Sequence, residues 1–227
     1  PRLVSHRETV ARKKRRMYVD WDYWGRPLPS FGDPDARLLI VGLAPAAHGG
    51  NRTGRMFTGD PTADFLAAAL HRAGFASQAT SLHRDDGLTL TDAFEIAVVR
   101  CAPPNDKSTS EEQRTCRAYL HEELELLPNL EVALAFGRVA FDNCLRALRE
   151  RTGEKLRFDF KHGARYDLGD GLVGCFAIPP GFGQVSAGEA VRVVVATNSN
   201  HGSGVHIMLD FTVNHLPFEH RVGFALV

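Results

Sequence analysis

The fold is decided by residues 37–70, RLLIVGLAPAAHGGNRTGRMFTGDPTADFLAAAL. Residues 37–43 form a continuous apolar run bounded by turn residues, which predicts a strand buried on both faces. Residues 44–60 follow as a glycine-rich loop, and unstructured loops of this length are usually functional or disordered. Asp60 beside Pro61 predicts a helix start, because an acid caps the first turn and proline fits its first position.

The same alternation of strand and helix continues along the chain. The predicted strands are 37–43, 95–100, 132–137 and 172–176, and the predicted helices are 61–73, 110–127 and 139–149. Strands alternating with helices imply a mainly parallel sheet that is covered on both faces. We therefore expect a three-layer α/β/α fold with a mainly parallel four-stranded central sheet, in a single domain over residues 1–227. Because ligands bind beyond the carboxyl ends of such strands, loops 44–60 and 101–108 should share one working edge.

Composition narrows the functional classes. Apolar residues make up 44% of the chain and charged residues 24%, a balance typical of soluble globular proteins. No apolar run approaches the roughly 20 residues that span a bilayer, so we expect a cytoplasmic monomer without a membrane partner. Lys plus Arg equal Asp plus Glu at 27 each, so net charge alone indicates no nucleic-acid partner.

The charge distribution is more informative than the total. Residues 1–16 hold seven Lys and Arg residues against the single acid Glu8, at the start of a basic and aromatic arm spanning 1–36. Such a block can neutralise DNA phosphates and release their counterions. The alternative is a solvated face of a terminal helix.

Several stretches of the chain resemble the family-5 (type b) uracil-DNA glycosylases. They are GLAPAAHGGNRTGRMFTGD at 42–60, YWGRP at 23–27, VRCAPP at 99–104 and KHGA at 161–164. The resemblance runs from residue 1 to about 176. It implies a DNA repair enzyme of base excision, a hydrolase that binds DNA containing uracil or other deaminated bases and cuts the N-glycosidic bond.

The chemistry of that reaction suits these residues. Bond breaking leaves an oxocarbenium-like sugar and a uracil anion, so the flipped base needs a stacking platform, hydrogen-bond donors and a nearby carboxylate. Backbone N–H groups of residues 42–49 can supply the donors. Phe57 resembles the aromatic on which the base stacks, with a core aromatic as the alternative. Asp60 matches the catalytic aspartate, which can orient a water and stabilise the sugar cation, although a plain N-cap would explain it too.

The resemblance implies a set of substrate-binding residues in the same segment. They are Gly42, Leu43, Ala44, Pro45, His48, Gly49, Asn51, Arg52 and Phe57. His48 contacts either DNA or only its own loop. The family's base pocket lacks a strand asparagine, and residues 95–100 contain none here, so the resemblance extends the expected substrates to hypoxanthine and xanthine.

The cysteines depart from the family pattern. Family members carry a 4Fe-4S cluster, an iron–sulfur metal site, on four cysteines, and Cys101 and Cys116 match the last two ligands. The first two would precede Pro1. Two thiolates cannot hold such a cluster, so either the chain is a truncated version of a longer protein or the cluster is lost. We expect truncation, because the chain has no initiating methionine.

Two further departures concern catalysis. The family has an asparagine after Cys-Ala-Pro-Pro-x, where this chain has Asp106; either Asp106 takes that place or the preceding Asn105 serves. The family's second motif, His-x-Ser-x-x-Asn, is missing after residue 176, so 177–227 is a divergent segment. A reading-frame slip would explain it, and His201 is a candidate substitute for the missing histidine or a surface-loop residue. The alternative function is a catalytically impaired DNA-binding relative.

Overall fold

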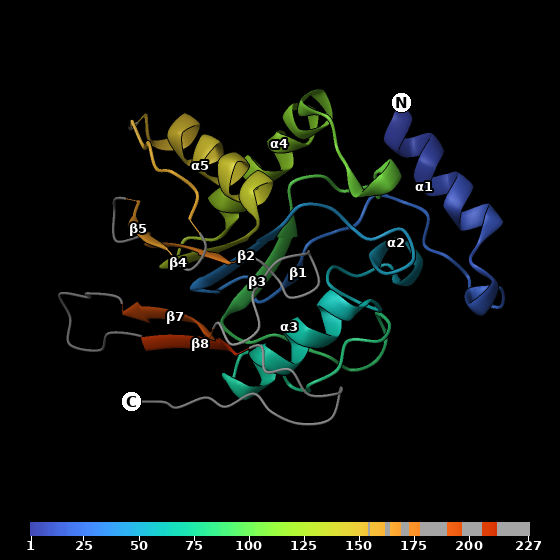
Figure 1. Cartoon of the computed structure of the whole chain (residues 1–227), viewed down its shortest axis with the longest axis horizontal. Coiled ribbons are helices and arrows are strands. Elements are labelled where there is room, and N and C mark those ends of the chain that lie inside the picture. The colour runs from blue at the N-terminus through green and yellow to red at the C-terminus, as the bar shows by residue number, and fades with distance from the viewer. Residues whose placement is uncertain (154, 162–163, 169–172, 178–189, 197–205, 213–227) are drawn as a thin grey trace.

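A six-stranded sheet forms the centre of the computed structural model, which describes residues 1–153, 155–161, 164–168, 173–177, 190–196 and 206–212 (Figure 1). The strand order is β1-β3-β2-β4-β6-β5. The strands are β1 (Phe31–Gly32), β2 (Leu38–Gly42), β3 (Ala93–Ala97), β4 (Val132–Phe136), β5 (Arg165–Asp167) and β6 (Val173–Ala177). The inner four run parallel, while β1 and β5 run antiparallel to their neighbours at the two edges.

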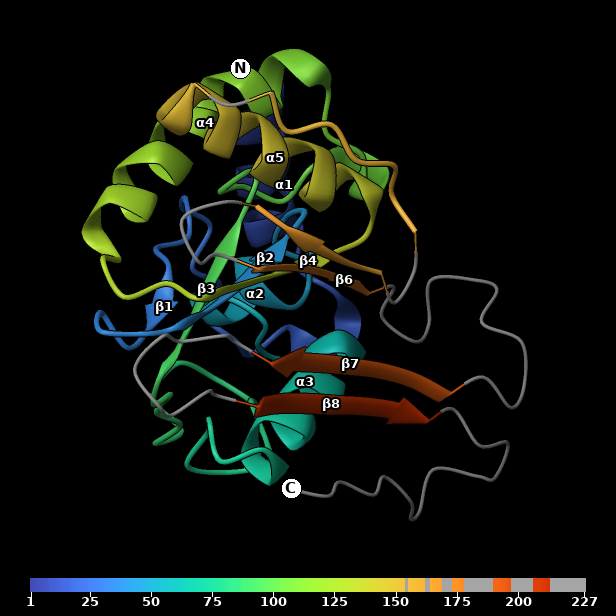
Figure 2. The ribbon, with the colours of Figure 1, turned by 90° about the vertical axis from the view of Figure 1, so that its left-hand side faces the viewer.

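Helices cover both faces of this sheet. Helix α3 (Pro61–Arg72) lies on one face, and α4 (Ser110–Leu126) and α5 (Arg138–Thr152) lie on the other, as Figures 1 and 2 show from two directions. Alternate residues of β2 supply the two cores: Leu38 and Ile40 pack with α3, whereas Leu39 and Val41 pack with α4 and α5. All four side chains are fully buried.

The predicted fold class is confirmed, with two differences in detail. The short antiparallel edge strands β1 and β5 were not expected, because strands of two or three residues carry too little periodicity to be recognised. The second parallel strand begins at Ala93 rather than residue 95 and ends at Ala97. Beyond it the chain bends, yet Val98 N–H still donates to Gly42 O and Val99 N–H to Leu43 O.

The basic arm is attached to the body of the protein. Helix α1 (Arg2–Lys13) is followed by the 3-10 turn η1 (Arg16–Tyr18). The Arg2 guanidinium donates to Glu112, which belongs to the capping box of α4, with N···O distances of 2.7 and 2.8 Å. Arg7 donates to the Cys101 thiol at 2.8 Å and to Gly25 O at 3.1 Å. The arm therefore contributes to the fold through its first half.

Beyond residue 177 the described chain forms one antiparallel ribbon, β7 (Ala190–Ala196) and β8 (His206–Thr212). The strand-like run 191–196 lies in β7. His201 lies outside the described residues. Within the described part of the chain, no helix combines the length and apolar character needed to cross a bilayer.

Candidate active site

Residues 44–60, here called the glycine loop, leave the carboxyl end of β2 and lead into α3. The loop is not structureless, since it contains the one-turn helix α2 (Gly50–Thr53). The Arg52 side chain joins its two ends: Nε donates to His48 O at 2.7 Å and Nη2 to Gly59 O at 2.8 Å. Arg52 is only 4% exposed, so the glycine loop encloses a positive charge, although a polar loop sequence predicts an exposed side chain.

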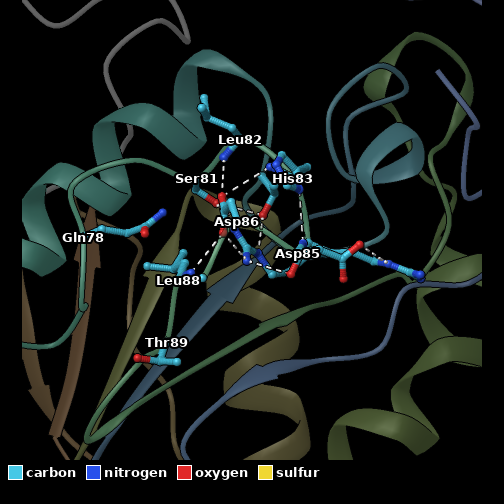
Figure 3. Close-up of polar contacts among 12 residues, drawn as sticks. Gln78, Ser81, Leu82, His83, Asp85, Asp86, Leu88 and Thr89 are labelled. Carbon is cyan, nitrogen blue, oxygen red and sulfur yellow. Dashed lines mark hydrogen bonds and ion pairs between the residues drawn. The ribbon is translucent and has the colours of Figure 1, made fainter. Parts of the chain in front are cut away.

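A buried ion pair holds the second half of the glycine loop. Arg55 donates to both carboxylate oxygens of Asp86, at 2.8 and 3.0 Å, and also to Thr58 and Ser81. Asp86 accepts three further hydrogen bonds from backbone N–H groups of its own turn, those of Leu82, His83 and Leu88 (Figure 3). Burial alone would raise the pKa of Asp86, but Arg55 and these N–H groups hold it below the usual range.

Phe57 lies between this network and the sheet. Its backbone adopts a φ of 40°, and Ser81 Oγ donates to its carbonyl at 2.9 Å. The ring lies against the backbone of Gly42, where any Cβ would come within 2.7 Å of Phe57 Cζ. It meets Phe136 edge-on at 5.9 Å. The half-buried ring packs against the core, so the core-aromatic interpretation holds in part and leaves the rest of the ring exposed.

Asp60 uses its two carboxylate oxygens differently. Oδ1 accepts the backbone N–H groups of Thr62 and Ala63, both at 3.0 Å, and so caps α3. Oδ2 accepts no hydrogen bond from the described residues and faces Gly49, where an added Cβ would overlap it. Burial raises the pKa of Asp60, while the Ala63 and Thr62 N–H groups oppose that shift. One oxygen is a cap, and the other remains available for chemistry.

His48 lies in the first half of the glycine loop, directly before Gly49, whose Cβ position meets Asp60 Oδ2. The His48 Nδ1 atom pairs with the Tyr23 hydroxyl at 3.0 Å. Burial, followed by the positive charges of Arg15 and Arg52, lowers the pKa of His48. The backbone N–H groups of Ala47 and His48 find no acceptor among the described residues. The loop thus retains donors beyond the end of β2.

Other predicted substrate-binding residues are placed inside the protein. Asn51 is fully buried and donates to Arg7 O and Ala47 O, which ties α1 to the glycine loop. Its Oδ1 lacks a partner among the described residues. Together with Arg52, Asn51 supports the loop from behind. Leu43 and Ala44 are half-buried beside the end of β2, and Pro45 is buried.

Asn105 and Asp106 lie in the short turn η2 (Pro104–Asp106), within residues 101–108, here called the proline turn. Both are exposed and both have left-handed backbones, with φ of 54° and 55°. The charge of Asp106 acts to raise the pKa of His48. The parallel pairing of β2 with β3, with Gly42 opposite Ala97, brings the glycine loop and the proline turn to the same edge of the sheet, as expected.

The described cysteines do not make a cluster site by themselves. Cys101 is buried and its thiol accepts a hydrogen bond from Arg7, while Cys116 packs against the same hydrophobic cluster. No group of three or more His, Cys, Asp or Glu side chains suited to a metal occurs in the described ranges. Because a 4Fe-4S cluster needs four ligands, two thiols do not fit it.

A cavity of about 530 Å³ lies on the outer side of the glycine loop. Arg52 and Thr53 belong to its wall, whereas Asp60 and Phe57 do not. It therefore lacks the predicted stacking aromatic and the predicted catalytic acid, although it includes Arg52 of the predicted substrate-binding set.

Three residues that hold this site were missed in the sequence, namely Arg55, Ser81 and Asp86. Asp86 lies in HRDDGL, a polar turn with nothing to mark one of its two acids as buried. The only usable signal was that DDG predicts a tight turn.

Known proteins resemble this chain over most of its length. The family model "Uracil DNA glycosylase superfamily" matches residues 29–202, a range that continues past residue 177. A type-5 uracil-DNA glycosylase of Thermus thermophilus is 48% identical over 171 residues, covering 75% of this chain and 76% of the relative. One of Pyrobaculum aerophilum is 48% identical over 164 residues, covering 72% and 69%. A type-4 uracil-DNA glycosylase of Thermotoga maritima is 34% identical over 110 residues, covering 48% and 49%. Because the family model spans well over half of its residues, the chain belongs to the uracil-DNA glycosylase superfamily.

Proposed function

We propose that this protein is a monofunctional DNA glycosylase that removes uracil from DNA by hydrolysis. The observation that carries the proposal is the division of labour at Asp60, whose Oδ1 caps α3 while Oδ2 faces the glycine loop without a hydrogen-bond partner among the described residues. The relatives named as type-5 uracil-DNA glycosylases support the same conclusion.

In the proposed reaction, the flipped nucleotide stacks on the exposed part of Phe57. The free N–H groups of Ala47 and His48 are candidates to bind the base oxygens as negative charge develops there. The bond from C1′ to N1 breaks, and its electron pair leaves with the base. Asp60 Oδ2 stabilises the cationic sugar and orients the water whose oxygen bonds to C1′, and the proton that this water releases passes to the departed base anion.

The base pocket is proposed to accept several deaminated bases. Strand β3 carries no asparagine or glutamine that could read the base edge, and its one polar side chain, Glu95, is 4% exposed. Burial raises the pKa of Glu95 well above its usual value, against the effect of Arg55. A pocket without a fixed amide cannot reject hypoxanthine or xanthine by leaving that amide unpaired.

The test is strand breakage after alkali treatment of a duplex that contains one uracil, with hypoxanthine and xanthine duplexes in parallel. Asp60→Asn is the sharpest variant, because asparagine caps a helix as well as aspartate but carries no charge. We expect it to lower the excision rate by roughly 10²-fold or more, with thermal stability retained.

Asp64→Asn is the matched control, since Asp64 is an exposed acid in the same first turn of α3. It should excise like the unmodified protein. Excision by Asp60→Asn at the unmodified rate would refute the proposed role of the carboxylate. Tight binding of the uracil duplex with no breaks from the unmodified protein would instead identify an impaired DNA-binding relative.

A further inference from the structure

The cavity outside the glycine loop is lined by aromatic and cationic side chains. Those that matter are Trp21, Tyr23, Trp24, Arg26, Arg52 and Arg84, and we call the site the aromatic–arginine pocket. At about 530 Å³ it has the volume of an ordinary small-ligand site.

Guanidinium groups lie against aromatic rings at this pocket. The Arg52 guanidinium lies 3.9 Å from the centre of the Tyr18 ring and 4.0 Å from that of Trp21. Arg84 and Arg26 lie 5.1 and 5.5 Å from the centre of the Trp24 ring. Planar rings and guanidinium planes are the surfaces on which unpaired bases stack, and the guanidinium charge attracts phosphate.

The Arg52 guanidinium has one nitrogen without a hydrogen-bond partner among the described residues. Its Nε and Nη2 atoms hold the glycine loop, but Nη1 has no hydrogen-bond acceptor among the described residues. The Arg52 side chain is nevertheless buried and lines the pocket. A charged donor held in this way is suited to an anion that enters from outside.

A track of positive charge leads to the pocket from α1. Residues 12–16 are all Lys or Arg, and four of the five are exposed. The stretch joins the aromatic segment directly, because Lys14 Nζ donates to Val19 O at 3.1 Å and Arg15 N–H donates to the Tyr23 hydroxyl at 3.4 Å. A single phosphate would not need such a track, whereas a nucleic-acid strand would follow it.

Two acids also border the pocket, and they limit what can bind. Asp85 pairs with Arg84 at 3.4 Å, and Asp22 lies exposed beside Trp21 in the chain. The pocket therefore has a mixed rim rather than a purely basic one. A ligand that offers both a ring and a phosphate suits it better than a bare anion.

We propose that the aromatic–arginine pocket binds an unpaired nucleotide in a single-stranded segment of DNA, outside the site that holds the excised base. The inference rests on the proposed function, which supplies DNA as the substrate. Arg52 links the two sites, since the side chain that lines the pocket also bonds Gly59 O, one residue before Asp60. Strand binding in the pocket thus fixes the loop that carries the catalytic carboxylate.

The test uses the protein's own fluorescence. The chain has two tryptophans, Trp21 and Trp24, and both line the pocket, so tryptophan emission reports on this site alone. The probes are a short uracil-free thymidine oligonucleotide, a uracil-free duplex of the same length, and thymidine monophosphate. We expect a saturable emission change with the oligonucleotide, at lower concentration than with either other probe.

Arg84→Ala should raise the Kd of the oligonucleotide roughly five- to tenfold. It should also reduce the slope of the logarithm of the binding constant against the logarithm of salt concentration by about 0.7, the value for one lost phosphate contact. Arg146→Ala is the matched control, because Arg146 is an exposed arginine on α5. It should leave both quantities unchanged. Equal effects of the two variants would overturn the proposal, and so would equal affinity for duplex or for thymidine monophosphate.

The uracil-excision assay separates this inference from the proposed function. Asp60→Asn should lose excision and keep the emission change. An unmodified protein that excises uracil but shows no emission change with the oligonucleotide would overturn the pocket and leave the glycosylase intact. An emission change without any excision would support the pocket and overturn the proposed glycosylase activity.

Discussion

The glycine loop and the proline turn meet at the same edge of the sheet, yet they are built in opposite ways. The glycine loop has the construction of a core: Arg52 and Arg55 are each 4% exposed and every contact they make ties one part of the protein to another. The proline turn presents Asn105 and Asp106 to solvent on a left-handed backbone. We therefore expect changes in the glycine loop to disturb the geometry of the site, and changes in the proline turn to leave that geometry in place.

The largest expected effect comes from breaking the support of the glycine loop. Asp86→Ala leaves the Arg55 guanidinium buried without its counter-charge, and the pair is only 5% and 7% exposed. Removing one partner of a buried ion pair typically costs about 3–5 kcal/mol. We expect a loss of that size in the free energy of unfolding, measured by urea denaturation, together with loss of excision.

The neighbouring acid provides the control for that change. Asp85→Ala removes a carboxylate that is 77% exposed and, among the described residues, pairs only with the half-exposed Arg84. Its effect on stability should stay within about 0.5 kcal/mol. If the two variants were equally stable, Asp86 would not be the support of the loop.

Adding one methyl group beside Asp60 should disturb the geometry of the site more than it lowers the stability of the protein. Gly49→Ala places a methyl group where Asp60 Oδ2 now lies. The backbone of Gly49, with φ −98° and ψ −108°, lies outside the α and β regions, so alanine also adds some local strain. Moving a reacting group by about 1 Å can cost 10²-fold in rate, and we expect a loss of excision of about that size. The melting temperature should change far less than in Asp86→Ala.

Gly74→Ala is the control for glycine replacement as such. Gly74 has a positive φ of 83° and no atom within 4 Å of its Cβ position, so alanine there adds backbone strain without touching the site. It should lower stability by about 1 kcal/mol and keep full excision. Full excision by Gly49→Ala would contradict the placement of Oδ2.

The same contrast explains what the sequence could predict. Leu38 to Val41 and the Asp60–Pro61 start of α3 follow local rules, so strand, helix and cap were predicted at nearly the right residues. Asp60 was predicted as both cap and catalyst, and its two oxygens now allow both roles.

The burial of charged side chains could not be predicted, because it depends on residues that are far away in the sequence. Whether Arg55 is buried depends on Asp86, 31 residues away, and Trp24 gains Arg84 only through the fold. Sequence patterns predict that arginine lies at the surface, because they record local polarity. They do not record the distant acid whose charge stabilises an arginine in the interior. The resemblance implies that Asn51 and Arg52 bind substrate, and the structure adds that both side chains are buried and hydrogen-bonded to the backbone around the glycine loop.

The smallest expected effect concerns the proline turn. Asp106→Asn keeps the size of the side chain and a backbone type that tolerates the left-handed region, so stability should change by less than about 0.5 kcal/mol. An amide can donate to a base carbonyl where a carboxylate cannot, and excision should rise by less than about tenfold.

Removing the charge should also lower the pKa of His48 further, since Asp106 acts to raise it. An NMR titration of His48 measures that shift, with Asp142→Asn on α5 as the control that leaves it unchanged. If Asp106→Asn alters neither excision nor His48, while Asn105→Gly abolishes excision, then Asn105 and not Asp106 is the residue of this turn that faces the base.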